Sequence, residues 1–216
     1  MIKTVLFDLD GTIVDTNELI IETFLYTLEG LTDKPLTRDF IAVNMGKPLR
    51  EQLHFFTGLE DVDHLIDKYR GYNVNRHDEL VREFPGVSEV IGRLHANGIR
   101  LGVVTSKVRR TTDMGLKLCG LEKYMDVIVT VEDVERPKPA AEPVLKAIQA
   151  LGADKESTLM VGDSHYDILS AQGAGVLSAG VAWSLKGEEF LNSFAPNYML
   201  QEMQDLLSIA GIKDRV

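Results

Sequence analysis

Residues 4–15 read Thr-Val-Leu-Phe-Asp-Leu-Asp-Gly-Thr-Ile-Val-Asp, an apolar run that stops abruptly at aspartates. The run at 4–7 has the length and the β-branched content of a buried parallel strand. Asp8 and Asp10 lie two positions apart just past that strand, so their side chains project to the same side. Gly11 permits the sharp turn that follows. Carboxylates at the end of an apolar strand are unfavourable unless a cation or a catalytic task explains them.

Four further apolar runs, at 101–104, 127–129, 159–161 and 178–181, predict strands of the same kind. Helical patterns separate the later runs; one apolar stripe with i, i+3, i+4, i+7 spacing begins at Val87. Strands that alternate with helices predict an α/β fold, a three-layer Rossmann-like parallel sheet covered on both faces. Such a sheet binds ligands beyond the carboxyl ends of its strands.

Residues 15–82 break this alternation. They contain helical patterns around Phe24, after Thr37, after Pro48 and around Leu65, and no convincing strand. A helical block directly after the first strand indicates an inserted cap, not a βαβ crossover. We therefore expect a catalytic core made of 1–14 and 83–216, with an all-helical cap at 15–82.

The composition excludes several classes of function. The chain has 216 residues and a formal net charge of −10, which disfavours broad binding to nucleic acid or to an anionic membrane. A small anion in a locally positive pocket remains compatible with that charge. The single cysteine, Cys119, allows no internal disulfide and no zinc site built on several thiolates. No apolar run approaches the roughly 20 residues of a membrane span, and the N-terminal run is too short for a signal peptide, so a cytoplasmic protein is expected.

A second carboxylate motif follows the fourth predicted strand, where Gly162 precedes Asp163, Ser164 and, further on, Asp167. An isolated Asp-x-Asp pair is more simply a solvated loop, and Asp163 or Ser164 could serve only as a helix N-cap. Two such motifs at the carboxyl ends of core strands favour a shared site. An N-cap role and a metal-binding role can coexist.

Two other elements belong to the same set. The second core strand ends in Thr105 and Ser106, whose hydroxyl and backbone N–H groups could hold an anion. Lys138 lies between two prolines, which restrict its backbone and reduce the entropy lost in aiming its ammonium. Taken alone, Thr105 could simply end a strand and Lys138 could be a solvated lysine.

The order of these motifs, D-x-D-G-T, a strand ending in Thr, a lysine beside prolines, and G-D-S-x-x-D, resembles the haloacid dehalogenase (HAD) superfamily of phosphotransferases. The resemblance spans nearly the whole chain, and the helical block is similar to a C1-type cap. It implies that Asp8 is the nucleophile, that Asp10 is the general acid and base, and that Thr105 and Lys138 bind the transferring phosphoryl group. It also implies that the first strand lies between the second and the fourth.

The same resemblance implies a Mg2+ cofactor. Its ligands would be Asp8, the backbone carbonyl of Asp10, and Asp163, with Asp167 supporting the ion directly or through water. Oxygen ligands of this kind suit Mg2+. An aspartate at position 10 also argues for phosphate chemistry, because true haloacid dehalogenases lack it.

Within the superfamily the chain is most similar to the PpaX-type inorganic pyrophosphatases, through 4–20, G-K-P-L-R-E-Q-L at 46–53, 75–78, 83–87 and 134–139. This implies hydrolysis of pyrophosphate, including that formed by HPr kinase/phosphorylase. Phosphoglycolate phosphatases share the motifs, and Ala141 stands where a second proline is usual, so phosphoglycolate or another small phosphomonoester is an alternative substrate. A β-phosphoglucomutase-like mutase is a further alternative. A non-catalytic phosphate binder or a receiver-like module is disfavoured, because no catalytic residue is missing.

Lys47 and Arg50, beside a glycine and a proline of the cap, are the candidates for meeting a second phosphate. The alternative for both is a solvated helix face. The partners expected overall are a small phosphorylated substrate, no nucleic acid and no membrane. We expect a monomer or a weak dimer.

Overall fold

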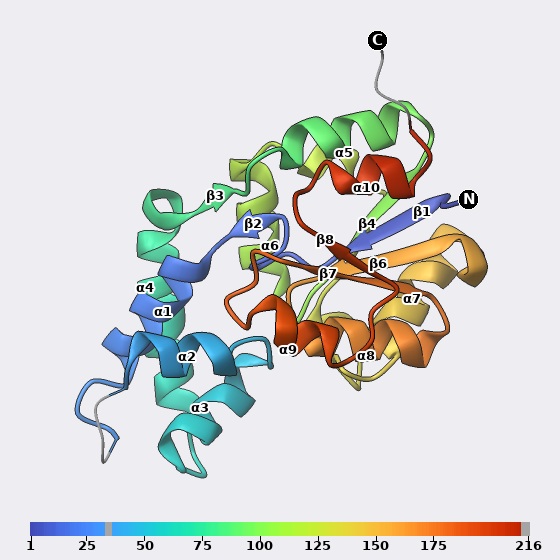
Figure 1. The fold of residues 1–216 in the computed structure, drawn as a ribbon. Coiled ribbons are helices and arrows are strands. Elements are labelled where there is room, and N and C mark those ends of the chain that lie inside the picture. The colour runs from blue at the N-terminus through green and yellow to red at the C-terminus, as the bar shows by residue number, and fades with distance from the viewer. Residues whose placement is uncertain (33–35, 213–216) are drawn as a thin grey trace.

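A six-stranded sheet forms the centre of the molecule in the computed structural model, which describes residues 1–32 and 36–212 (Figure 1). Every neighbouring pair of its strands is parallel, and the order is β5-β4-β1-β6-β7-β8. The strands are β1 (Thr4–Phe7), β4 (Arg100–Val104), β5 (Val127–Val129), β6 (Thr158–Gly162), β7 (Leu177–Val181) and β8 (Tyr198–Leu200). The predicted α/β class is confirmed, and β1 lies between β4 and β6 as expected.

The five predicted strands are present, each within one residue of its expected ends. The sixth, β8, is a three-residue edge strand, too short for any periodicity to mark it. The last helix is also short, since α10 is Asp205–Ile209. Asp205 accepts the backbone N–H groups of Gln201 and Glu202, and these bonds hold the preceding residues in a turn.

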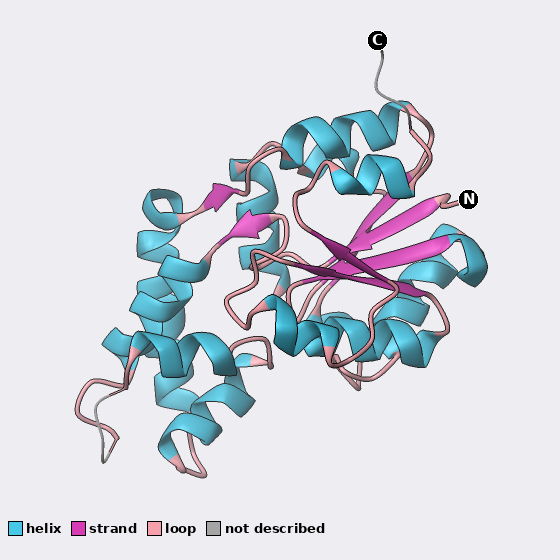
Figure 2. Cartoon of the chain, viewed as in Figure 1, coloured by secondary structure: helices cyan, strands magenta, loops and turns pink. Residues whose placement is uncertain are grey.

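Helices cover both faces of the sheet, as Figure 2 shows. Side chains alternate along β1, so Val5 and Phe7 enter one buried cluster and Leu6 enters the other. The first cluster lies against α5 (Val87–Ala96), α6 (Arg109–Leu118) and α10, and the second against α7 (Glu142–Leu151) and α8 (His165–Ala174). The stripe predicted from Val87 is buried along its whole length. The remaining helical elements of the core are α9 (Glu188–Asn192) and the 3-10 turns η1 (Glu122–Tyr124), η2 (Val131–Asp133) and η3 (Lys155–Ser157).

Four helices form a separate bundle beside the carboxyl edge of the sheet (Figure 1). They are α1 (Asn17–Thr27), α2 (Arg38–Asn44), α3 (Leu49–Thr57) and α4 (Asp63–Leu80), and each matches a predicted helix. The bundle has its own buried cluster, in which Phe24 meets Phe56 edge to face at 5.1 Å between ring centroids. Residues 33–35 of the predicted cap and residues 213–216 of the predicted core lie outside the described residues. Within the described residues, no helix is both long and apolar enough to cross a bilayer.

Two segments of the chain connect the sheet with the bundle, and they pair with each other as short strands. β2 (Val14–Asp15) and β3 (Arg82–Glu83) form an antiparallel two-stranded ribbon. The expectation of no strand in 15–82 is therefore wrong at both ends of that segment. Strands of two residues carry no readable pattern, and what defines them is the pairing of distant segments.

Candidate active site

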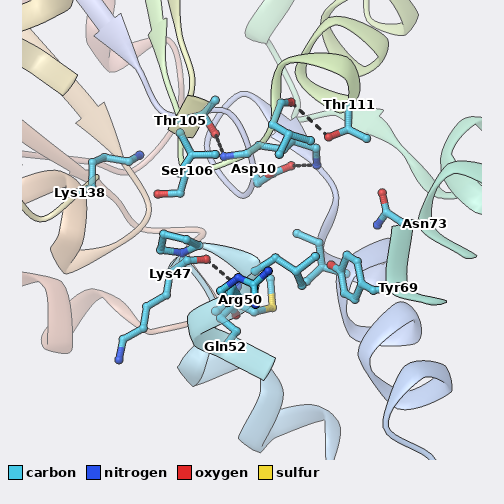
Figure 3. A pocket seen from close by; sticks show the side chains of 18 of the residues that line it. Asp10, Lys47, Arg50, Gln52, Tyr69, Asn73, Thr105, Ser106, Thr111 and Lys138 are labelled. Atoms are coloured by element: carbon cyan, nitrogen blue, oxygen red, sulfur yellow. Dashed lines mark hydrogen bonds and ion pairs between the residues drawn. The ribbon is translucent and has the colours of Figure 1, made fainter. Parts of the chain in front are cut away.

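A cavity of about 610 Å3 lies where the carboxyl ends of β1, β4 and β6 face the helical bundle (Figure 3). Residues from the core and from the bundle share its lining, so the cavity belongs to both parts of the fold. All nine predicted site residues line it: Asp8, Asp10, Lys47, Arg50, Thr105, Ser106, Lys138, Asp163 and Asp167.

Lys138 joins two of the aspartates. Its Nζ donates to Asp8 Oδ1 at 2.6 Å, to Asp167 Oδ1 at 2.6 Å and to the carbonyl of Val104 at 3.0 Å. Burial alone would lower the pKa of Lys138, but the carboxylates of Asp167 and Asp8 outweigh it and raise that pKa. The ammonium is therefore charged and fixed at the end of β1.

Asp8, Asp163 and Asp167 form an acidic cluster, because each offers a carboxylate oxygen within 4.8 Å of the others. Burial raises the pKa of Asp8 well above its ordinary value, and repulsion from Asp167 and Asp163 adds to this despite Lys138. Burial also raises the pKa of Asp163 to about 7, with Lys186 acting in the opposite direction. Two buried carboxylates and one half-buried carboxylate against one bonded ammonium leave an excess of negative charge. An oxygen-only site of this kind fits a hard divalent cation.

The start of α8 fixes Asp167. The Ser164 hydroxyl accepts the N–H of Tyr166 at 3.0 Å, and the Ser164 N–H donates to Asp167 Oδ2 at 3.1 Å. Ser164 and Asp167 form a capping box, so Ser164, not Asp163, is the N-cap residue. Asp167 then has one oxygen on the helix backbone and the other on Lys138, and it is held rigidly.

Two glycines make room for these carboxylates. A Cβ on Gly162 would lie 2.3 Å from the carboxyl carbon of Asp167, far inside contact distance. Gly11 has φ +80°, and a Cβ there would lie 2.6 Å from Asp163 Oδ2. Gly11 thus allows an aspartate from the end of β6 to approach the first motif, and Gly162 makes room for the second aspartate of its own motif.

Asp10 is held by a threonine and a lysine. Its Oδ1 accepts the hydroxyl of Thr16 at 2.6 Å and the ammonium of Lys107 at 2.8 Å. Both contacts use the same oxygen. Oδ2 therefore remains for an incoming group.

Thr105 and Ser106 follow β4 and present hydroxyls near Lys138 (Figure 3). The Thr105 side chain accepts the N–H of Lys107 at 3.2 Å, which shapes the turn. The Ser106 hydroxyl is buried and has no hydrogen-bond partner within residues 1–32 and 36–212. Buried hydroxyls are normally satisfied, so this one is suited to an oxygen of a bound molecule.

The two cap candidates line the cavity, but their charges have partners elsewhere. The ammonium of Lys47 lies 5.7 Å from the centre of the Phe55 ring, and Arg50 forms an ion pair with Asp63. In Figure 3 the Lys47 side chain extends away from Asp10. In this arrangement neither charge reaches the acidic cluster.

A lysine that the sequence analysis does not single out connects core and bundle. Lys186, in the loop after β7, donates to the carbonyl of Met45 at 2.7 Å. Burial lowers its pKa, and attraction to Asp163 acts in the opposite direction. In the same loop Ser184 donates to the backbone carbonyl of Asp163 at 2.6 Å. No motif marks this loop, and only the packing of distant segments reveals it.

Comparisons with known proteins agree with this geometry. Residues 5–181 match the family model described as haloacid dehalogenase-like hydrolase. A protein named pyrophosphatase PpaX from Anoxybacillus flavithermus is 46% identical over 214 residues, covering 99% of both chains. Its namesake from Bacillus velezensis is 44% identical over 214 residues, covering 98% of both chains.

Solved structures share the fold. A structure from Bacteroides fragilis described as a haloacid dehalogenase-like hydrolase has a TM-score of 0.86 at 28% identity, covering 95% of this chain and all of that one. Another from Lactobacillus plantarum, described as a phosphoglycolate phosphatase, has a TM-score of 0.86 at 22% identity, with 97% and 99% coverage. The second shows similarity of fold alone. Together these matches confirm the resemblance drawn from the motifs.

Proposed function

The chain belongs to the haloacid dehalogenase-like hydrolase family, and on that premise we propose that it is a Mg2+-dependent inorganic pyrophosphatase that works through a phosphorylated Asp8. One observation carries the reaction class: Lys138 bridges Asp8 and Asp167 beside Asp163 within a single cavity. The substrate rests on the identity of 46% to a protein named pyrophosphatase PpaX. The enzyme would act in the cytoplasm as a monomer or a weak dimer.

In this proposal, 1–14 and 83–216 form the catalytic core and 15–82 form a cap that closes over the substrate. The separate buried cluster of the bundle supports the division. The β2–β3 ribbon is the connection about which the cap would move.

The proposed Mg2+ site consists of Asp8, Asp163 and the backbone carbonyl of Asp10. Asp167 would support it, and water mediation suits Asp167 because both of its oxygens already accept hydrogen bonds. When bound, the ion offsets the charge that the three carboxylates and the phosphoryl group bring together. Raised pKa values at Asp8 and Asp163 support the need for such a cation.

In the first step a carboxylate oxygen of Asp8 attacks a phosphorus of pyrophosphate and forms the aspartyl-phosphate bond. The bond from that phosphorus to the bridging oxygen breaks, and its electron pair leaves with the second phosphate. Asp10 gives its proton to the departing oxygen. Lys138, Thr105 and Ser106 hold the equatorial oxygens, where the charge resides.

In the second step water attacks the phosphorus of the aspartyl phosphate. Asp10 accepts a proton from that water, and the bond between Asp8 and phosphorus breaks. The carboxylate of Asp8 is restored, and the net reaction is pyrophosphate plus water to two phosphates. Lys47 and Arg50 would meet the second phosphate once the cap closes and their present partners are exchanged.

The test is a comparison of kcat/KM for pyrophosphate, phosphoglycolate and hexose phosphates in the presence of Mg2+. We expect pyrophosphate to be preferred and chelation of Mg2+ to stop turnover. The matched control is Asp8→Asn, which has the same size and should be inactive on every substrate. A preference for phosphoglycolate or a hexose phosphate would contradict the pyrophosphatase proposal and would favour a phosphomonoesterase or a mutase.

A further inference from the structure

Lys107 has no role in the steps above, yet its side chain enters the cavity. Its ammonium lies 2.8 Å from Asp10 Oδ1, and the side chain is only 11% exposed. It comes from the turn after β4 and shares Asp10 Oδ1 with the hydroxyl of Thr16. We propose that Lys107 contacts the leaving phosphate directly and supplies the positive charge that this group needs, an inference that rests on the proposed pyrophosphatase function.

In this structure the other cations of the cavity contact other partners or lie exposed to solvent. Five lysines and arginines line it, and Lys138 already donates to three acceptors. Arg50 is paired with Asp63, and Lys47 lies over an aromatic ring. The fifth, Arg70, is exposed on α4. Lys107 is the one that contacts the proposed general acid.

The stereochemistry of proton transfer places Lys107 beside the leaving group. A general acid must come within hydrogen-bond distance of the oxygen that departs. In pyrophosphate that oxygen is bonded to the second phosphorus, so the free oxygens of the leaving phosphate would lie close to the carboxyl of Asp10. Lys107 and Thr16 both contact Oδ1, which leaves Oδ2 to carry the proton. An ammonium held at Oδ1 is then within reach of the leaving phosphate.

The chemistry gives Lys107 a selective effect. As the bridging bond breaks, its electron pair moves onto a phosphate that is already anionic, and a fixed cation stabilises that charge as it develops. The leaving group of p-nitrophenyl phosphate is a phenolate with no charged phosphate oxygens. Lys107 should therefore accelerate the cleavage of pyrophosphate far more than that of the aryl ester.

The experiment compares Lys107→Met with the wild type on both substrates, at saturating Mg2+. We expect kcat/KM for pyrophosphate to fall roughly ten- to hundredfold more than kcat/KM for p-nitrophenyl phosphate, as for the loss of a charge-assisted hydrogen bond. Lys107→Arg, which keeps the charge, should recover part of the loss on pyrophosphate. Lys117→Met is the matched control; it lies on α6, its side chain is 65% exposed, and both activities should be unchanged.

Equal losses on the two substrates would overturn the inference, because they would mean that Lys107 does not act on the leaving phosphate. If the wild type hydrolyses pyrophosphate and Lys107→Met loses equal activity on both substrates, the role of Lys107 is refuted and the pyrophosphatase function stands. A wild-type enzyme that does not hydrolyse pyrophosphate would refute both. Circular dichroism and the Tm of Lys107→Met show whether its loss of activity comes from misfolding. If it does, Lys107→Arg decides the question. A kcat/KM that falls more for pyrophosphate than for p-nitrophenyl phosphate supports the role of Lys107, and equal changes refute it.

Discussion

Replacing Asp163 with asparagine should stabilise the metal-free protein above neutral pH. The side chain keeps its size, and the backbone carbonyl that accepts the Ser184 hydroxyl is unaffected. The substitution removes a half-buried negative charge beside two buried carboxylates. The gain in stability should be large because no second ammonium bonds to the cluster among the described residues.

The magnitude follows from the pKa. Burial raises the pKa of Asp163 from 3.8 to about 7, a shift of about three units, and each unit is worth about 1.4 kcal/mol. The folded state then binds the proton more tightly than the unfolded state, so this group makes stability fall as pH rises from about 4 to about 7. At pH 8 the variant should exceed the wild type by up to about 4 kcal/mol, or roughly 10 °C in Tm for a chain of this size. The difference should shrink as pH falls toward 4.

The assay is thermal unfolding in EDTA at pH 5, 6, 7 and 8, repeated with increasing Mg2+. Asp113→Asn, outside the cluster on α6, is the control, and its stability should differ from that of the wild type by the same amount at every pH. Mg2+ should stabilise the wild type by about 2.7 kcal/mol at a hundred times its Kd, and it should stabilise Asp163→Asn little. A wild type as stable as Asp163→Asn at pH 8 without metal would refute the reasoning from excess negative charge.

Four other substitutions test separate parts of the site. Lys138→Met leaves two buried carboxylates unpaired, so denaturant unfolding should show a loss of about 3–5 kcal/mol and turnover should cease; a stable variant would contradict the pairing. Lys186→Met removes the hydrogen bond to the bundle, and steady-state kinetics should show KM for pyrophosphate rising several-fold with a smaller change in kcat; an unchanged KM would show that the contact does not hold the cap. Lys47→Ala and Arg50→Ala should each impair pyrophosphate hydrolysis more than p-nitrophenyl phosphate hydrolysis, and equal losses would argue against contacts to a second phosphate.

The sequence predicts the sheet well because its inner strands are buried on both faces and read as continuous apolar runs. It also predicts where the polar motifs lie, since each follows directly from the end of such a strand. The carboxyl ends of neighbouring parallel strands share one edge, and Asp8 and Asp163 accordingly fall within the same acidic cluster. Each of these inferences depends on local pattern alone.

Other features depend on pairings between distant segments, which no local pattern records. Lys186 contacts the bundle from a loop that carries no motif, and Lys107 forms an ion pair with Asp10, 97 positions away in the sequence. The edge strand β8 has three residues, and the strands β2 and β3 have two each. Strands this short are defined only by their hydrogen bonds to the neighbouring strand. The engagement of Arg50 with Asp63 is likewise invisible before the cap is folded.

The most direct measurement asks whether Asp8 becomes phosphorylated. The enzyme is mixed with Mg2+ and pyrophosphate, quenched during turnover and treated with borohydride, which reduces an acyl phosphate to an alcohol. Peptide mass spectrometry should then find homoserine in place of aspartate at position 8, and the signal should be absent when substrate is omitted. An unmodified Asp8 during rapid turnover, or reduction at a different carboxylate, would contradict the mechanism.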